Sequence, residues 1–411
     1  MLNKHPKALD YKAIRIAGIE GKRYDISIRD GRFTSVKETV PEEPAGQAGY
    51  SGEWLPEGEP GQREPAQPAG ADIPQADLWI SPGIIDLHTH LAWTDFDHAD
   101  QLKRSSSEVE AMQGAAFGAT LRTGVTTARD AGGITPQTIR HLVRSYGHPL
   151  RVETSSEMLG PADALGTKFL EGRLAEIYAT GAGWVKIMAT GGLGAPAEKV
   201  LDPVFSEEEF DFIVRHAHAH QIKVLVHTWG GVTIDWSIRA GVESIEHGMF
   251  LTADQAGRLA ESRTAYVSTA SIYRIAADPS GVLALPQVIC DRAARAAEAH
   301  SRAIGYARSA GVRFGFGTDY ATPALHGYNL QELDTLLDYG LTRAEAWQSA
   351  TSGAAEILGR GHDLGRIAEG YLADAVIWNV DPFQARSADV LRESIVSVIT
   401  GESEAELAGG R

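Results

Sequence analysis

The chain has very few of the residues on which some kinds of site depend. Cys290 is the only cysteine among its 411 residues, so an internal disulfide and a zinc site made of thiolates are excluded. Lys and Arg are also scarce: 38 of them stand against 54 Asp and Glu, which leaves a formal net charge of -16. Nucleic-acid binding needs clustered positive charge, so we expect no nucleic-acid partner.

Long apolar segments are missing as well. No run of about 18 apolar residues occurs, and residues 1–30 lack the apolar stretch of about 7–15 residues that a secretory signal peptide carries. We therefore expect no transmembrane helix, no membrane partner and a cytoplasmic location. Hydrophobic residues make up 43% of the chain, as in ordinary globular proteins, and a small-molecule substrate is the expected partner. The sequence leaves open whether copies of the chain form a homo-oligomer.

Both ends of the chain have the texture of short β-strands rich in β-branched residues. The segments with this texture are residues 13–19, 24–28, 33–36 and 375–380. An Arg-Asp-Gly-Arg turn at residues 29–32 separates the second segment from the third. We predict that residues 1–80 and 370–411 form one small β-sandwich domain.

Residues 41–76 are dense in Pro, Gly, Glu and Gln and contain few large apolar side chains. Such a composition buries little apolar surface, so we predict a long loop or insertion here. A lid over a substrate site is the alternative interpretation of the same segment.

Residues 81–369 alternate short apolar runs with segments of helical periodicity. The runs that predict strands are residues 84–90, 124–130, 150–157, 184–188, 224–227, 242–247, 265–269 and 313–319. Residues 206–220 and 291–310 are among the predicted helices between them. Eight strand–helix repeats with buried parallel strands are typical of an α/β fold of the (β/α)8 TIM-type barrel kind, which we predict for this part of the chain.

Two histidines end the first predicted barrel strand. His88 and His90 follow an apolar run, and because side chains alternate along a strand, both imidazoles face the same side. Such a pair at the carboxyl end of a barrel strand can form half of a metal site, although the pattern alone is weak. His216, His218 and His220 share the spacing, but they lie on a predicted helix and are interpreted as surface residues.

Lys186 lies inside a predicted buried strand, residues 184–188. Lysine is rarely buried without a partner, and desolvation favours its neutral amine. A neutral amine can react with carbon dioxide to give a carbamate, whose carboxylate can bridge two cations. A buried pair with an acid, or an amine that reaches solvent from the strand end, is the alternative.

His227, His247 and Asp319 also end predicted strands. A histidine at one strand end is often structural, but two on consecutive strands weaken that interpretation. A carboxylate such as Asp319 can bind a metal and also accept a proton from metal-bound water. The carboxyl ends of barrel strands converge on one mouth, so one shared metal site is predicted. Its predicted ligands are His88, His90, Lys186, His227, His247 and Asp319.

The motifs around these residues resemble those of the amidohydrolase superfamily along nearly the whole chain. The segments that carry the resemblance are residues 82–90, 124–130, 245–248, 317–319 and 365–375. Residues 186–192 resemble the branch that contains metal-dependent Xaa-Pro-type dipeptidases, arginine or lysine carboxypeptidases and ochratoxin-cleaving amidases. That branch is often labelled imidazolonepropionase-related.

The resemblance implies a binuclear site bridged by a carboxylated Lys186. In that subtype, His88, His90 and Asp319 would bind the more buried metal, and His227 and His247 would bind the second. The cofactors implied are two divalent metal ions, with zinc as the default, and a carbamate on Lys186. The ring-opening imidazolonepropionases proper lack the bridging lysine, so Lys186 argues against that activity.

Departures from the branch leave the substrate open. The branch usually carries a Gly-Gly-His segment after the third strand, but residues 160–168 contain no histidine. Its fifth-strand motif is His-Ala-x-Gly, whereas Trp229 brings a bulky indole that would narrow the pocket. Tyr273 is a candidate match for a tyrosine near the substrate, with a packed aromatic as the alternative. Asp130 is a further candidate for a substrate contact.

We predict metal-dependent hydrolysis of a C–N amide bond in a dipeptide or an N-acyl amino acid. The attacking group is a metal-bridging hydroxide, and Asp319 moves its proton to the departing amine. Hydrolysis of a cyclic amide, imide or lactone at the same metals is the alternative. A non-catalytic barrel is a more distant alternative, because such a protein is expected to lose metal ligands.

Overall fold

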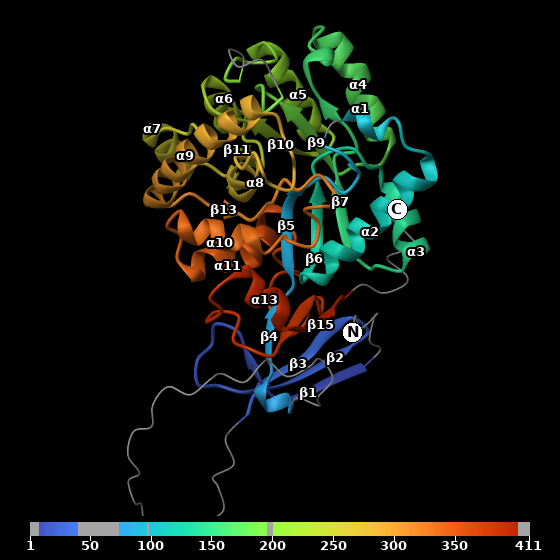
Figure 1. Cartoon of the computed structure of the whole chain (residues 1–411), viewed down its shortest axis with the longest axis vertical. Helices are drawn as coiled ribbons and strands as arrows, with labels where there is room; N and C mark the ends of the chain where they lie inside the picture. Colours follow the sequence, from blue (N-terminus) through green and yellow to red (C-terminus); the bar gives the residue numbers. More distant parts are fainter. Residues whose placement is uncertain (1–7, 40–73, 97, 195–199, 402–411) are drawn as a thin grey trace, which may run out of the picture.

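The computed structural model describes residues 8–39, 74–96, 98–194 and 200–401. It has an α/β fold in which helices pack around parallel strands, and this confirms the predicted class (Figure 1). A separate sheet, built from strands of both chain ends, lies at the bottom of the same view.

The strands of the two chain ends pair in one six-stranded sheet. In sheet order they are β15 (Ile395–Ile399), β14 (Ala375–Trp378), β4 (Trp79–Pro82), β1 (Ala8–Ile16), β2 (Tyr24–Arg29) and β3 (Arg32–Glu38). In the turn between β2 and β3, Asp30 and Gly31 adopt φ angles of 48° and 71°, as expected for a tight hairpin turn. Both chain ends therefore contain β-strands, as predicted. A sandwich needs a second facing sheet and stays a prediction.

The segment predicted as a loop at 41–76 lies largely outside the described residues, which resume at Pro74. A short 3-10 helix, η1 (Gln75–Asp77), then leads into β4. Arg23 donates hydrogen bonds to the carbonyls of Ala13 in β1 and Ala76 in η1. These bonds hold the short helix against β1.

The parallel strands form a three-stranded and a six-stranded sheet. The first has the order β5 (Ile84–Thr89), β6 (Val125–Asp130), β7 (Arg151–Thr154). The second has the order β13 (Phe314–Gly315), β12 (Ala265–Val267), β11 (Ser244–His247), β10 (Lys223–Thr228), β9 (Trp184–Met188), β8 (Met158–Leu159). Each of the eight predicted strand ranges overlaps an observed strand.

Three observed strands, β7, β12 and β13, end well before their predicted ranges do. The predicted strand at residues 150–157 ends at Thr154, because Ser156 turns the backbone with a φ of 61° before β8 begins. Thr269 and Asp319 have φ angles of 51° and 56°, and they lie beyond the ends of β12 and β13. A non-glycine residue in this left-handed region leaves the extended ladder.

Backbone hydrogen bonds connect β5 to the segment that follows β13. The Leu87 amide donates to the Phe316 carbonyl at 2.8 Å, and the His90 amide donates to the Tyr320 carbonyl at 2.9 Å. Because β5 and β13 are edge strands of different sheets, these bonds bring the two sheets together. They also place the residues just after both strands side by side.

Helices fill the connections between the parallel strands. They are α1 (His98–Gln101), α2 (Ser106–Arg122), α3 (Pro136–Tyr146), η2 (Pro161–Asp163), α4 (Thr167–Ala179), α5 (Glu207–Ala219), α6 (Val232–Ala240), α7 (Ala253–Ala260), α8 (Ala270–Ala276), α9 (Gln287–Ala310), α10 (Gln331–Asp338), α11 (Arg343–Ala350), α12 (Ser352–Ile357) and α13 (Ala388–Ser394). The predicted helix at 206–220 corresponds to α5, whose start is set by a capping box between Ser206 and Glu209. The helix predicted at 291–310 begins earlier, after Pro286.

The main core lies between the parallel strands and these helices. All residues of β5, β6 and β11 are buried, which explains why these strands read as continuous runs instead of alternating patterns. Within the described residues, no helix combines the length and the apolar character that crossing a membrane requires.

Candidate metal centre

One cavity of about 360 Å³ contains all six predicted ligands. They come from β5, β9, β10, β11 and the segment after β13. The residues that the structure brings together there are His88, His90, Lys186, His227, His247 and Asp319. They share a cavity because each lies at or near the carboxyl end of its strand.

Asp319 lies among three imidazoles. Its Oδ1 atom is 3.4 Å from Nε2 of His88 and 3.3 Å from Nε2 of His90, and its Oδ2 atom is 3.9 Å from Nδ1 of His247. Burial would raise the pKa of Asp319, but the His88 and His90 rings outweigh it and hold the pKa well below its usual value. The side chain is 21% exposed, so the carboxylate faces the cavity.

A buried contact with Glu246 orients His88. Nδ1 of His88 is 2.6 Å from Oε2 of Glu246, which leaves Nε2 directed at Asp319 and, at 3.4 Å, at Nζ of Lys186. Arg129 donates to Oε1 of Glu246 at 2.9 Å and to the Leu87 carbonyl at 2.6 Å. A carboxylate behind a histidine fixes its ring orientation and raises its basicity as a ligand.

Glu246 and Arg129 were not recognised as functional residues from the sequence. Burial would raise the pKa of Glu246, but the Arg129 guanidinium and the His88 ring lower it to about 2. The guanidinium carbon also lies 4.4 Å from the ring centre of Trp184. Arg129 and Glu246 lie inside the motifs at 124–130 and 245–248, and a charged residue within a strand predicted to be buried was the signal that could have identified them.

Contacts with two loops position His90. Its Nδ1 atom lies 3.1 Å from the carbonyl of Gly132, so Nε2 faces Asp319. Its ring stacks on Trp93 with centroids 4.0 Å apart. Both contacts come from the loops that follow β5 and β6, and they hold the ring against the cavity wall.

Lys186 is buried, with 1% of its surface exposed. Burial lowers its pKa to about 8, against the opposing charges of Glu246 and Asp319. Its amine lies 3.4 Å from Nε2 of His88. The alternative in which the amine reaches solvent from the strand end does not fit this burial.

His227 and His247 are held in neutral form. Burial, helped by the nearby Lys186, lowers the pKa of His227 to about 3, and its Nε2 atom lies 2.8 Å from the Gly191 carbonyl. Burial and the neighbouring His227 lower the pKa of His247 well below its usual value. Nδ1 of His247 lies 2.7 Å from the Thr269 hydroxyl. Neutral imidazole is the form of histidine that binds metals.

The donor set fits divalent metal ions. One ligand atom each of His88, His247 and Asp319 lie within 4.8 Å of one another. Imidazole nitrogen and carboxylate oxygen suit several divalent transition metals, zinc among them. His90, His227 and Lys186 line the same cavity.

The three predicted substrate contacts lie at different depths. Tyr273 lines the cavity, and its ring lies edge-on to His247 with centroids 6.0 Å apart. Trp229 packs behind Tyr273 at 5.6 Å and is almost fully buried. Asp130 is buried at the end of β6, where its carboxylate accepts hydrogen bonds from the Leu91 and Gly132 amides. Trp229 and Asp130 thus lie behind the cavity surface. Their direct contact with a substrate stays a prediction.

The three histidines interpreted as surface residues lie on α5. His216 is partly buried and lies 3.1 Å from the Tyr178 hydroxyl, and its ring stacks on His220. His218 lies 3.4 Å from Glu243. None of these three lines the candidate metal cavity.

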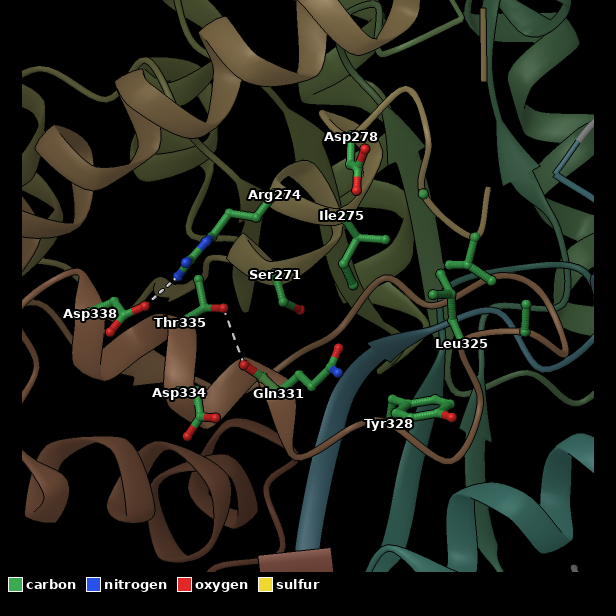
Figure 2. A pocket seen from close by; sticks show the side chains of 13 residues that line it. Ser271, Arg274, Ile275, Asp278, Leu325, Tyr328, Gln331, Asp334, Thr335 and Asp338 are labelled. Atoms are coloured by element: carbon green, nitrogen blue, oxygen red, sulfur yellow. Dashed lines mark hydrogen bonds and ion pairs between the residues drawn. The ribbon is translucent and has the colours of Figure 1, made fainter. Parts of the chain in front are cut away.

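A larger cavity of about 640 Å³ lies on the other face of α8 (Figure 2). Its charged groups already have partners: Arg274 pairs with Asp338 at 2.6 Å, and Asp334 accepts a hydrogen bond from the Ala388 amide. Asp278 accepts hydrogen bonds from Ser280. No histidine is among the described residues that line it, so the smaller cavity is the candidate site.

Comparison with known families agrees with the geometry. The sequence model of the Amidohydrolase family matches residues 79–403, which include all six candidate ligands. The chain belongs to the amidohydrolase family. This amidohydrolase is therefore an enzyme, a hydrolase that acts on carbon–nitrogen bonds, and the predicted family is confirmed.

The individual relatives of this amidohydrolase share only a modest part of its sequence. An uncharacterized protein of Mycobacterium tuberculosis is 29% identical over 305 residues, which cover 71% of this chain and 78% of the relative. An ochratoxinase of Aspergillus niger is 30% identical over 206 residues, 50% of this chain and 42% of the relative. A solved Xaa-Pro dipeptidase is 23% identical with a TM-score of 0.79, covering 96% of this chain and 98% of that one. This last similarity shows the shared fold.

Proposed function

We propose that this amidohydrolase hydrolyses the C–N bond of an open-chain amide at a site for two divalent metal ions, most simply zinc. The observation that carries the proposal is the position of Asp319, with Oδ1 within 3.4 Å of Nε2 of both His88 and His90. When bound, the metal ions would polarise the substrate carbonyl and lower the pKa of a water molecule. The residues that would hold them are His88, His90, Lys186, His227, His247 and Asp319.

Lys186 has the environment that a carbamate needs. A pKa of about 8 increases the neutral fraction of the amine by about two orders of magnitude compared with an exposed lysine. The neutral nitrogen attacks the carbon of carbon dioxide and loses one proton, which leaves a carboxylate on the side chain. We propose that this carbamate supplies the oxygen ligands that an amine lacks.

Asp319 moves the proton in this proposal. Its carboxylate accepts a proton from the attacking water and then donates it to the nitrogen of the departing amine. The low pKa of Asp319 keeps its carboxylate ionised. His88 and His90 hold it in place through the contacts described above.

The proposed architecture is a closed (β/α)8 barrel at residues 81–369, with a β-sandwich domain from residues 1–80 and 370–411. The backbone bonds from Leu87 and His90 to the segment after β13 support closure between the first and last strands. We also propose a cytoplasmic location.

The test is a metal-replete hydrolysis screen with open-chain amides, cyclic imides and lactones, each assayed beside the chelator-treated protein. We expect metal-dependent release of an amine from at least one open-chain amide. Cleavage of imides or lactones alone would favour the alternative reaction at the same metals. If metal analysis showed no bound ion in protein that had been incubated with excess divalent metal, a non-catalytic barrel would be favoured.

A further inference from the structure

The side chains that line the metal cavity say more about the substrate than the candidate metal ligands do. We infer that the substrate carries uncharged apolar groups on both sides of its scissile amide. This inference rests on the proposed function, because it concerns the same cavity. It favours amides formed from an apolar acid and an apolar amine over dipeptides and N-acyl amino acids, which carry a carboxylate.

The first wall, called the β5-side wall, consists of Trp93, Phe96 and Met158, all lining the cavity. Trp93 and Met158 both pack against the glycine pair after β6. A β-carbon on Gly132 would come within 2.5 Å of Met158, and one on Gly133 would come within 2.9 Å of Trp93. Two glycines therefore let these large side chains approach the loop closely.

The second wall, called the α8-side wall, consists of Leu193, Ile272 and Tyr273. These three belong to one apolar cluster, in which Ile272 and Tyr273 are 3% and 2% exposed. Trp229 packs in the same cluster behind Tyr273. Because of this backing, the α8-side wall presents a fixed apolar surface to the cavity.

The two walls flank the ligand cluster. Trp93 stacks on His90 at the β5 side, and Tyr273 meets His247 edge-on at the α8 side. The His88 ring lies between them, with its centroid 5.5 Å from that of His90 and 4.9 Å from that of His247. A carbonyl held at the cluster would therefore place its acyl group against one wall and its amine group against the other.

Both walls favour the binding of apolar substrate groups. Apolar groups that leave water for these surfaces gain binding free energy, whereas a carboxylate loses its hydration and must find a cation. Among the described residues that line the cavity, the charged side chains are Lys186 and Asp319, and both belong to the ligand cluster. Among the described residues of the two walls, a substrate carboxylate would meet aromatic rings, a thioether and aliphatic chains but no cation.

The experiment compares two amides that differ only in a carboxylate: N-phenylacetyl-phenethylamine and N-phenylacetyl-phenylalanine. We expect kcat/KM to be about tenfold or more higher for the phenethylamine compound. Equal or faster cleavage of the phenylalanine compound would overturn the inference and leave the proposed function intact. Cleavage of neither, with activity on dipeptides, would also overturn only the inference. No cleavage of any amide would overturn both.

A charge placed in the wall gives a second test. Met158→Arg puts a cation into the β5-side wall, and Met158 is partly exposed, so the longer side chain has room to extend. We expect the ratio of kcat/KM values to shift about tenfold or more toward the phenylalanine compound. Leu165→Arg is the matched control, because Leu165 is 65% exposed and does not line the cavity. An unchanged ratio in folded, metal-loaded Met158→Arg would contradict the placement of the walls.

Discussion

Nδ1 of His88 lies 2.6 Å from Oε2 of Glu246, and both side chains are fully buried. The contact fixes which nitrogen of His88 faces the cavity, and Arg129 keeps the carboxylate ionised from its other side. A candidate ligand on β5 is thus oriented by a residue of β11, a strand of the other parallel sheet. This arrangement leads to predictions for metal binding and for stability.

Glu246→Gln is expected to weaken metal binding about 10- to 100-fold. The amide keeps the size of the side chain but loses the charge that orients His88 and raises its basicity. Competition with a coloured chelator measures the affinity. Glu110→Gln is the matched control, because Glu110 pairs with a histidine, His141, on the surface. Equal affinities of the two variants would show that Glu246 does not position His88.

Arg129→Met is expected to lower the free energy of unfolding by about 3–5 kcal/mol. The change leaves Glu246 buried without its cation, while both residues of the pair have no exposed surface. Urea titration followed by circular dichroism measures the effect. Arg302→Met removes an arginine from an exposed pair with Glu298 and should leave the midpoint unchanged. A similar midpoint for both variants would argue against the buried pair.

Asp319→Asn is expected to lower kcat for amide hydrolysis by about 100-fold or more. The amide retains an oxygen but cannot accept and return a proton. Metal content must be measured in the same sample, because Asp319 is also a proposed ligand. If the metal-loaded variant stayed within about tenfold of the wild type, the proton-transfer role would be wrong.

Metal-loaded protein is expected to carry a carbamate on Lys186 that the metal-free protein lacks. The buried amine has a lowered pKa, and bound cations would stabilise the added carboxylate. Carbon-13 NMR of protein loaded with metal in labelled bicarbonate should show one carbamate resonance, and Lys186→Ala should remove it. A bare amine in fully loaded, active protein would rule the carbamate out.

Glu332 predicts a pH dependence of stability outside the metal centre. Its carboxylate accepts hydrogen bonds from the Ala270 and Ser271 amides, but burial outweighs them and raises its pKa to about 7. The folded protein therefore binds this proton more tightly than the unfolded chain, whose pKa is near 4.5. The contribution of Glu332 to stability is complete below about pH 4.5 and is lost as the pH rises through about 7.

The size of this loss is roughly 3 kcal/mol. Glu332→Gln cannot titrate, so the difference in unfolding free energy between wild type and variant should shift in favour of the variant from pH 5 to pH 8. Urea titrations at the two pH values measure that difference. A constant difference would mean that Glu332 is ionised throughout.

Local patterns in the sequence determined the strands and the candidate ligands. Continuous apolar runs predicted eight strand positions, because strands buried on both faces have no polar side to show. His88, His90 and Lys186 were predictable for a related reason, since a polar residue that ends or interrupts such a run has few structural explanations. The sequence also determined that ligands at the carboxyl ends of parallel strands would meet.

Only the tertiary structure decided what surrounds the ligands. The pairing of Arg129 with Glu246 depends on two strands far apart in sequence, and no local pattern reports which buried charges face each other. Trp229 packs against Tyr273, and Asp130 accepts hydrogen bonds from the Leu91 and Gly132 amides, so both positions depend on contacts between different segments of the chain. Side-chain period is a local property, whereas the contents of a cavity depend on how loops and strands pack around it.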